Sequence, residues 1–138
     1  MNIDKILSKE QIPEINTLSP LTLAFIGDGV YEMFIRTKIL SLGNQPANQL
    51  HKTAVKFVKA SAQARAAHEI FETLTDEEKD IYKRGRNTNI HTVPKNADMA
   101  DYRHATALEA LVGYLYIKGE SARLEEILDT AFTILNRE

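Results

Sequence analysis

Apolar residues recur with a helical period along almost the whole chain, and this pattern restricts the fold more than any other feature of the sequence. No stretch alternates between apolar and polar residues as a strand does, so the sequence predicts an all-α protein. At 138 residues the chain can build one hydrophobic core, and we expect a single domain over 1–138. Helices are expected over 3–9, 20–42, 46–74, 76–85, 98–118 and 121–136.

Several of these helix ends carry residues that stabilise helix termini. Ser19 before Pro20 is typical of an N-cap followed by the first helical position. Thr75 and Glu78 have the spacing of a capping box, and Gly119 is suited to end the helix before it. The segment 86–97 has no apolar period and predicts a long loop, which makes it a candidate for function.

Two acidic residues interrupt apolar helical stretches. Asp28 lies within the apolar segment 21–31, and Glu109 lies within the segment 105–116. Burying an ionised carboxylate costs free energy unless a cation compensates it. The two acids therefore predict either a shared divalent ion or two structural roles, in which each acid caps a helix or pairs with a buried Arg, Lys or Tyr. Oxygen ligands without cysteine favour Mg²⁺ or Mn²⁺ over zinc.

Small residues surround both acids. Gly27, Gly29 and Gly113 each cost about 1 kcal/mol in a helix relative to alanine, and close helix approach is the expected compensation. Such packing would bring Asp28 and Glu109 together although they are distant in sequence.

Charge and composition give few indications of a partner. The chain has 17 basic and 19 acidic residues, so its overall charge does not indicate nucleic-acid binding, which would depend on local patches. Cysteine is absent, the N-terminus is too polar for a signal peptide, and no apolar run approaches the length of a membrane span. We expect a soluble, cytoplasmic protein with no membrane partner.

Basic residues gather in two segments that lack acids. Lys52, Lys56 and Lys59 share one helix face by their spacing, either as a solvated surface or as a contact to nucleic-acid phosphates. The segment 81–97 combines basic and amide side chains that suit sugar and phosphate groups. The candidates for nucleic-acid binding are Lys52, Lys56, Arg84, Arg86, Asn87, Lys95 and Asn96.

Two segments resemble the acidic motifs of the ribonuclease III endonuclease domain: 23–32 (LAFIGDGVYE) and 105–113 (ATALEALVG). Further segments make the chain similar to Mini-ribonuclease III, the catalytic domain without an appended double-stranded-RNA-binding domain. These are 84–87 (RGRN), 94–97 (PKNA), 102–106 (YRHAT) and 109–116 (EALVGYLY). The order and spacing of the segments cover nearly the whole chain.

The resemblance implies a homodimeric, metal-dependent endonuclease that cuts double-stranded RNA to 5'-phosphate and 3'-hydroxyl ends. Asp28 and Glu109 match the family's catalytic metal ligands, with Mg²⁺ as the cofactor and Mn²⁺ as a substitute. Phe25 matches an aromatic residue at the dimer interface, and its alternative is an ordinary core position. The implied substrate is precursor large-subunit (23S) ribosomal RNA, with a ribosomal protein as a candidate partner that shapes it.

The chain departs from full-length ribonuclease III at two positions. Ala24 and Thr106 stand where that enzyme has further acids, a pattern that resembles Mini-ribonuclease III. Two functional alternatives remain: a non-catalytic dimeric RNA-binding module in ribosome assembly, and a helical protein-interaction adaptor. Retention of Asp28 and Glu109 argues against the first, and the basic segment 81–97 argues against the second.

Overall fold

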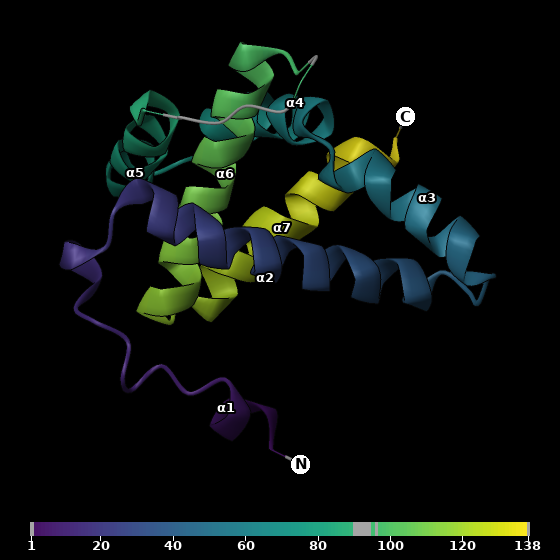
Figure 1. Cartoon of the computed structure of the whole chain (residues 1–138), viewed down its shortest axis with the longest axis horizontal. Coiled ribbons are helices and arrows are strands. Elements are labelled where there is room, and N and C mark those ends of the chain that lie inside the picture. The colour runs from purple at the N-terminus through teal and green to yellow at the C-terminus, as the bar shows by residue number, and fades with distance from the viewer. Residues whose placement is uncertain (1, 90–94, 96, 138) are drawn as a thin grey trace.

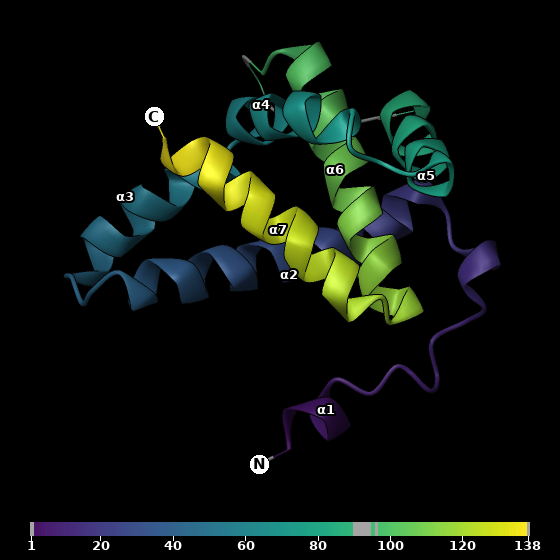
Figure 2. The ribbon, with the colours of Figure 1, turned by 180° about the vertical axis from the view of Figure 1, so that it is seen from behind.

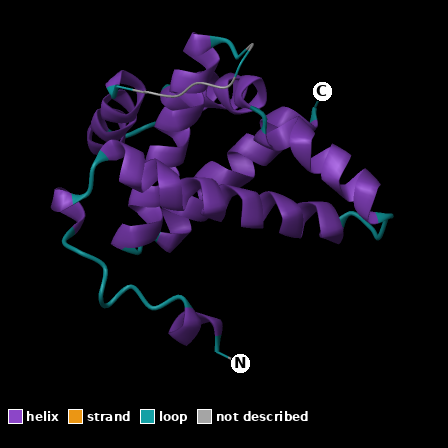
Figure 3. Ribbon diagram, in the orientation of Figure 1, coloured by secondary structure: helices purple, strands orange, loops and turns teal. Residues whose placement is uncertain are grey.

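The computed structural model describes residues 2–89, 95 and 97–137, and in these residues it contains helices and no strand (Figure 3). The all-α prediction is confirmed. The elements are α1 (Ile3–Ile6), the 3-10 helix η1 (Ile15–Thr17), α2 (Pro20–Ser41), α3 (Ala47–Val58), α4 (Ala60–Phe71), α5 (Asp76–Asn87), α6 (Met99–Lys118) and α7 (Ser121–Asn136).

Helix α6 forms the centre of the molecule. It packs against α2, α4, α5 and α7, and the two views from opposite sides show these helices around it (Figures 1 and 2). Leu108, Leu111 and Val112 of α6 are among the largest fully buried side chains. Because other helices pack on several sides of α6, they restrict the position of any polar side chain of α6 that points toward them.

The predicted helix caps are confirmed. The Ser19 hydroxyl accepts a hydrogen bond from the Thr22 amide at 3.2 Å, with Pro20 at the first helical position of α2. The Thr75 amide donates to the Glu78 carboxylate at 2.9 Å, and the Glu78 amide donates to the Thr75 hydroxyl at 3.2 Å, which completes the capping box. These bonds are local, so the sequence alone was sufficient to predict them.

The prediction of one helix over 46–74 is wrong, because the chain bends at Lys59 between α3 and α4. Lys59 has extended backbone angles (φ −64°, ψ 152°), so the last carbonyls of α3 lack partners in the helix. The Tyr31 hydroxyl donates to the Phe57 carbonyl at 2.8 Å, and the Gln63 amide donates to the Val58 carbonyl at 2.9 Å. Two side chains from other helices therefore stabilise an end that the local sequence does not mark.

Two expectations about glycine are also corrected. Helix α5 continues through Gly85 to Asn87, because a glycine here lets α5 approach the backbone of Ala107 in α6. Gly29 faces open space, so the predicted close helix approach is wrong at this position. It is confirmed at Gly27 and Gly113, where α2 crosses α6.

The N-terminal segment extends away from the helices that surround α6 (Figure 1). Helix α1 ends at Ile6, before the expected end at Lys9, and it buries no residue. The Lys9 ammonium lies 4.2 Å from the centre of the Tyr116 ring, which connects this segment to α6.

Within the described part of the chain, none of the helices combines the length and the apolar character that crossing a membrane requires.

Candidate functional site

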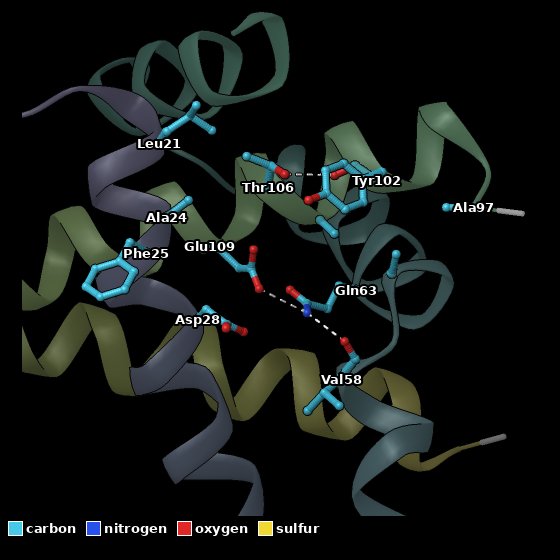
Figure 4. A pocket seen from close by; sticks show the side chains of 12 residues that line it. Leu21, Ala24, Phe25, Asp28, Val58, Gln63, Ala97, Tyr102, Thr106 and Glu109 are labelled. Carbon is cyan, nitrogen blue, oxygen red and sulfur yellow. Dashed lines mark hydrogen bonds between the residues drawn. The ribbon is translucent and has the colours of Figure 1, made fainter. Parts of the chain in front are cut away.

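A cavity of about 530 Å³ opens where α2, α4 and α6 meet at the C-terminal end of α3 (Figure 4). Both acids that the sequence singled out line it, one from α2 and one from α6. No Lys, Arg or His is among the described residues that line this cavity. The lining residues are Leu21, Ala24, Phe25, Asp28, Val58, Ala60, Gln63, Ala97, Tyr102, Ala105, Thr106 and Glu109.

Glu109 carries the strongest electrostatic signal of the cavity. Its side chain is half-buried on α6. Burial raises the pKa of Glu109 to about 8, and the adjacent Asp28 carboxylate is the next cause. The Gln63 amide acts in the opposite direction, since it donates to the Glu109 carboxylate at 3.4 Å. The ionised form of Glu109 therefore lacks compensation by a cation among the described residues of the cavity.

Asp28 lies on the exposed rim of the same cavity, so the prediction that both acids are buried is wrong for this residue. The predicted convergence is correct: α2 brings Asp28 beside Glu109, close enough for the two carboxylates to interact. A cation that both acids shared would thus be reached from solvent on the Asp28 side.

The sequence interpretation missed Gln63. This residue of α4 is 3% exposed, and its amide lies between the end of α3 and Glu109. The Gln63 carbonyl oxygen is buried without a hydrogen-bond partner among the described residues. An amide inside an alanine-rich helix gives no signal in the sequence, because only the bend at Lys59 places it beside Glu109.

Ala24 and Thr106 also line the cavity, and both are buried. The Thr106 hydroxyl donates to the Tyr102 carbonyl at 3.0 Å and is therefore used within α6. The two positions that the sequence resemblance matched to further acids of full-length ribonuclease III thus lie in the wall of this cavity, and here they add no carboxylate to it.

Phe25 is 81% exposed at the edge of the cavity, so the alternative that it is a core residue is wrong. Leu21 and Met33 on the same helix are 42% and 68% exposed. Helix α2 therefore presents apolar side chains to solvent next to the acidic pair. The assignment of Phe25 to a dimer interface stays a prediction.

Two lysines of α3 lie near the end of the helix that borders the cavity. Lys52 and Lys56 are both exposed, and Val58, the last residue of α3, lines the cavity. At 1.5 Å per residue, Lys56 is about 3 Å and Lys52 about 9 Å from Val58 along the axis. Both interpretations, an RNA contact and a solvated surface, agree with this position.

The basic residues near the end of α5 are more ordered than a loop, which corrects the prediction of a loop from residue 86. Arg84 is exposed, 4.0 Å from the Asp80 carboxylate, and Arg86 donates to the Asn87 side chain at 3.1 Å. Arg103 of α6 donates to the Arg86 carbonyl at 3.3 Å, which ties the end of α5 to α6.

The following segment is described only in part. Lys95 is exposed, and Ala97 lines the cavity directly before α6. Asn96, which is also predicted to bind RNA, lies outside the described residues.

Comparison with known proteins defines the class to which this helical fold belongs. The family model of the ribonuclease III domain matches residues 21–120. A crystal structure of a protein from Fusobacterium nucleatum has a TM-score of 0.79 and 33% identity, and covers 86% of this chain and 95% of that chain.

Relatives that match most of the chain belong to a narrower group and are named Mini-ribonuclease 3. The protein from Thermoanaerobacter sp. (strain X514) is 50% identical over 131 residues, which cover 95% of this chain and 90% of the relative. The protein from Symbiobacterium thermophilum is 46% identical over 121 residues, which cover 88% and 93%. The chain therefore belongs to the ribonuclease III family, in its Mini-ribonuclease 3 group, and is an endoribonuclease.

Proposed function

We propose that this endoribonuclease cleaves double-stranded RNA in a metal-dependent reaction, and that Asp28 and Glu109 are its metal ligands. The observation that supports this proposal is the convergence of the two carboxylates in one cavity, where burial and mutual repulsion raise the pKa of Glu109 to about 8. Two adjacent ionised carboxylates repel each other, and a divalent cation between them compensates this repulsion.

The donor set fits Mg²⁺, with Mn²⁺ as a substitute. Proteins commonly hold Mg²⁺ through one or two carboxylates and leave the other positions to water and substrate phosphates, which matches two acids at an open cavity. When bound, the ion would neutralise charge on the scissile phosphate and lower the pKa of a water. Asp28 and Glu109 supply its negative ligands, and the cavity wall of Ala24 and Thr106 leaves space beside them.

The RNA would be recognised by its backbone. A-form duplexes hide most base edges, so exposed cations such as Lys52, Lys56, Arg84 and Lys95 suit phosphates and 2'-hydroxyls better than sequence. Arg86, Asn87 and Asn96 complete the proposed contact set. The products would carry 5'-phosphate and 3'-hydroxyl ends.

A homodimer would place one cavity on each strand of a duplex. The exposed Phe25 beside the cavity supports this assembly, because a second copy would remove it from water. We propose precursor 23S ribosomal RNA in the cytoplasm as the substrate, with a ribosomal protein as a partner that shapes it. The resemblance to Mini-ribonuclease III supports this choice of substrate and partner.

The sequence also suggested a dimeric RNA-binding module without catalysis, and membership in the Mini-ribonuclease 3 group argues against this function. The acidic pair speaks against it, because carboxylates next to a phosphate weaken binding unless a cation lies between them. Asp28→Asn and Glu109→Gln distinguish the two functions. Duplex RNA with Mg²⁺ should be cut by the wild type and by neither variant, whereas RNA binding should persist in both.

Single-stranded RNA and wild type with EDTA are the controls for this experiment. A variant that cuts as fast as the wild type would remove its residue from the site. Binding without cleavage by the wild type at all Mg²⁺ and Mn²⁺ concentrations would favour the module.

A further inference from the structure

We infer that Gln63 is a positioning residue for Glu109: its amide links the C-terminal end of α3 to the acidic pair and holds the Glu109 carboxylate in place for the cation. The inference rests on the proposed metal-dependent function and adds a residue to its site. Gln63 is 3% exposed, so its side chain is confined between α3, α4 and α6 (Figure 4).

The orientation of the Gln63 amide is decided by the Val58 carbonyl. This backbone oxygen accepts hydrogen bonds and cannot donate, so the amide atom 2.9 Å from it is the nitrogen. The same nitrogen is 3.4 Å from the Glu109 carboxylate, and Glu109 therefore always meets a donor on this side. A donor suits the ionised carboxylate that a metal ligand needs to be.

The other end of the amide shows that the hydrogen bond to Val58 does not by itself account for this residue. The Gln63 carbonyl oxygen is buried without a partner among the described residues, and a buried acceptor without a hydrogen bond destabilises the folded state. An apolar side chain of similar length would avoid that cost but would also remove the donor to the Val58 carbonyl, so the two effects on stability oppose each other. The amide is best explained by its contact with Glu109.

Tyr31 offers a matched control. Its hydroxyl donates to the Phe57 carbonyl at 2.8 Å, one residue from the Val58 carbonyl that Gln63 contacts. Both side chains thus stabilise the end of α3, and of the two only Gln63 has a hydrogen bond to Glu109. Loss of anchoring at α3 is common to Gln63→Met and Tyr31→Phe, whereas loss of the contact with Glu109 is specific to Gln63→Met.

The test measures Mn²⁺ binding without RNA, by electron paramagnetic resonance of free Mn²⁺, together with the melting temperature of the metal-free protein. Gln63→Met should weaken Mn²⁺ binding about tenfold, the lower end of the usual effect of such partners, and should melt no lower than Tyr31→Phe, because loss of the bond to Val58 is offset by removal of the unpaired carbonyl oxygen. Tyr31→Phe should melt lower and bind Mn²⁺ as the wild type does. With RNA, Gln63→Met should need about tenfold more Mg²⁺ for half-maximal cleavage.

Three results would overturn the inference: unchanged Mn²⁺ binding in Gln63→Met, a lower melting temperature in that variant with unchanged metal dependence, or equal weakening by Tyr31→Phe. If the wild type binds Mn²⁺ and Asp28→Asn does not, the proposed metal site stands even when the inference about Gln63 fails. If the wild type binds no Mn²⁺, both the inference about Gln63 and the proposed metal-dependent function are wrong.

Discussion

Gly27 of α2 and Gly113 of α6 lie against each other's helix backbone where the two helices cross. A Cβ atom added to Gly27 would be 1.8 Å from the Glu109 carbonyl oxygen and 2.8 Å from the Gly113 nitrogen. A Cβ atom added to Gly113 would be 1.9 Å from the Leu23 carbonyl oxygen. This crossing allows two acids 81 residues apart to share one cavity, because α2 approaches α6 closely at Glu109.

Replacement of Gly27 should strongly reduce the stability of the protein. Gly27→Ala is expected to destabilise the protein by more than about 3 kcal/mol, because backbone atoms that cannot move aside occupy the space of the new methyl group. Gly29→Ala is the control: its Cβ meets open space, and alanine in a helix should stabilise by about 0.5–1 kcal/mol. Urea unfolding followed by circular dichroism measures both. Equal stability of the two variants would contradict the crossing.

The acidic pair should make the metal-free protein less stable as the pH rises. Because the pKa of Glu109 is about 8 in the folded chain and 4.5 ordinarily, the unfolded chain loses this proton first, and stability falls between these values. Asp28→Asn removes a cause of the shift and should stabilise the protein at pH 8 by about 1 kcal/mol, with a smaller gain at pH 5. Urea unfolding in EDTA checks this, and Glu32→Gln, which removes an acid with a weaker influence on the pKa of Glu109, should have less effect. A gain independent of pH would refute it.

Arg123 should be important for stability through Glu78. The Arg123 guanidinium donates to both Glu78 oxygens at 2.8 Å and lowers the pKa of that carboxyl, whose side chain is 8% exposed. Arg123→Met leaves a buried carboxylate without a cation and should cost about 3 kcal/mol at pH 7. The cost should shrink as the pH falls and Glu78 takes up a proton. Arg137→Met breaks an exposed pair with Glu69 and should cost less than about 1 kcal/mol.

Phe25 should control assembly. If a second copy covers this side chain, Phe25→Asp should convert a dimer to a monomer, measured by size-exclusion chromatography with light scattering at micromolar concentration. Ile3→Asp, at an exposed apolar residue of α1, should leave the assembly unchanged. A wild type that is already monomeric, or a variant that stays dimeric, would exclude Phe25 from the interface.

The arginines at the end of α5 should determine the salt dependence of RNA binding. Replacing Arg84 and Arg86 by alanine should weaken binding to duplex RNA and reduce the slope of log K against log salt by about 1 for each lost phosphate contact. Arg137→Ala, an exposed arginine of the C-terminal end, is the control. Fluorescence anisotropy in Ca²⁺, to prevent cleavage, measures the slopes. An unchanged slope would remove these arginines from the RNA contact.

Part of the site was visible in the sequence because it depends on residue type and period. Asp28 and Glu109 stood out as charges in apolar helices, and the small residues around them predicted the approach of α2 to α6. The burial of Asp28 was predicted wrongly. Apolar residues such as Leu21 and Phe25 give the same helical pattern whether they face a core or solvent, so the pattern did not reveal that this side of α2 is open.

The all-α class, the cap at Ser19 and the capping box at Thr75 depend on neighbours along the chain, so they could be predicted from the sequence. The bend at Lys59 and the place of Gln63 could be seen only in the folded protein. At the bend, Tyr31 and Gln63 donate hydrogen bonds to the end of α3, and the proposed role of Gln63 depends on its distance from Glu109. Such contacts join residues far apart in sequence, and they exist only once α2, α4 and α6 have packed together.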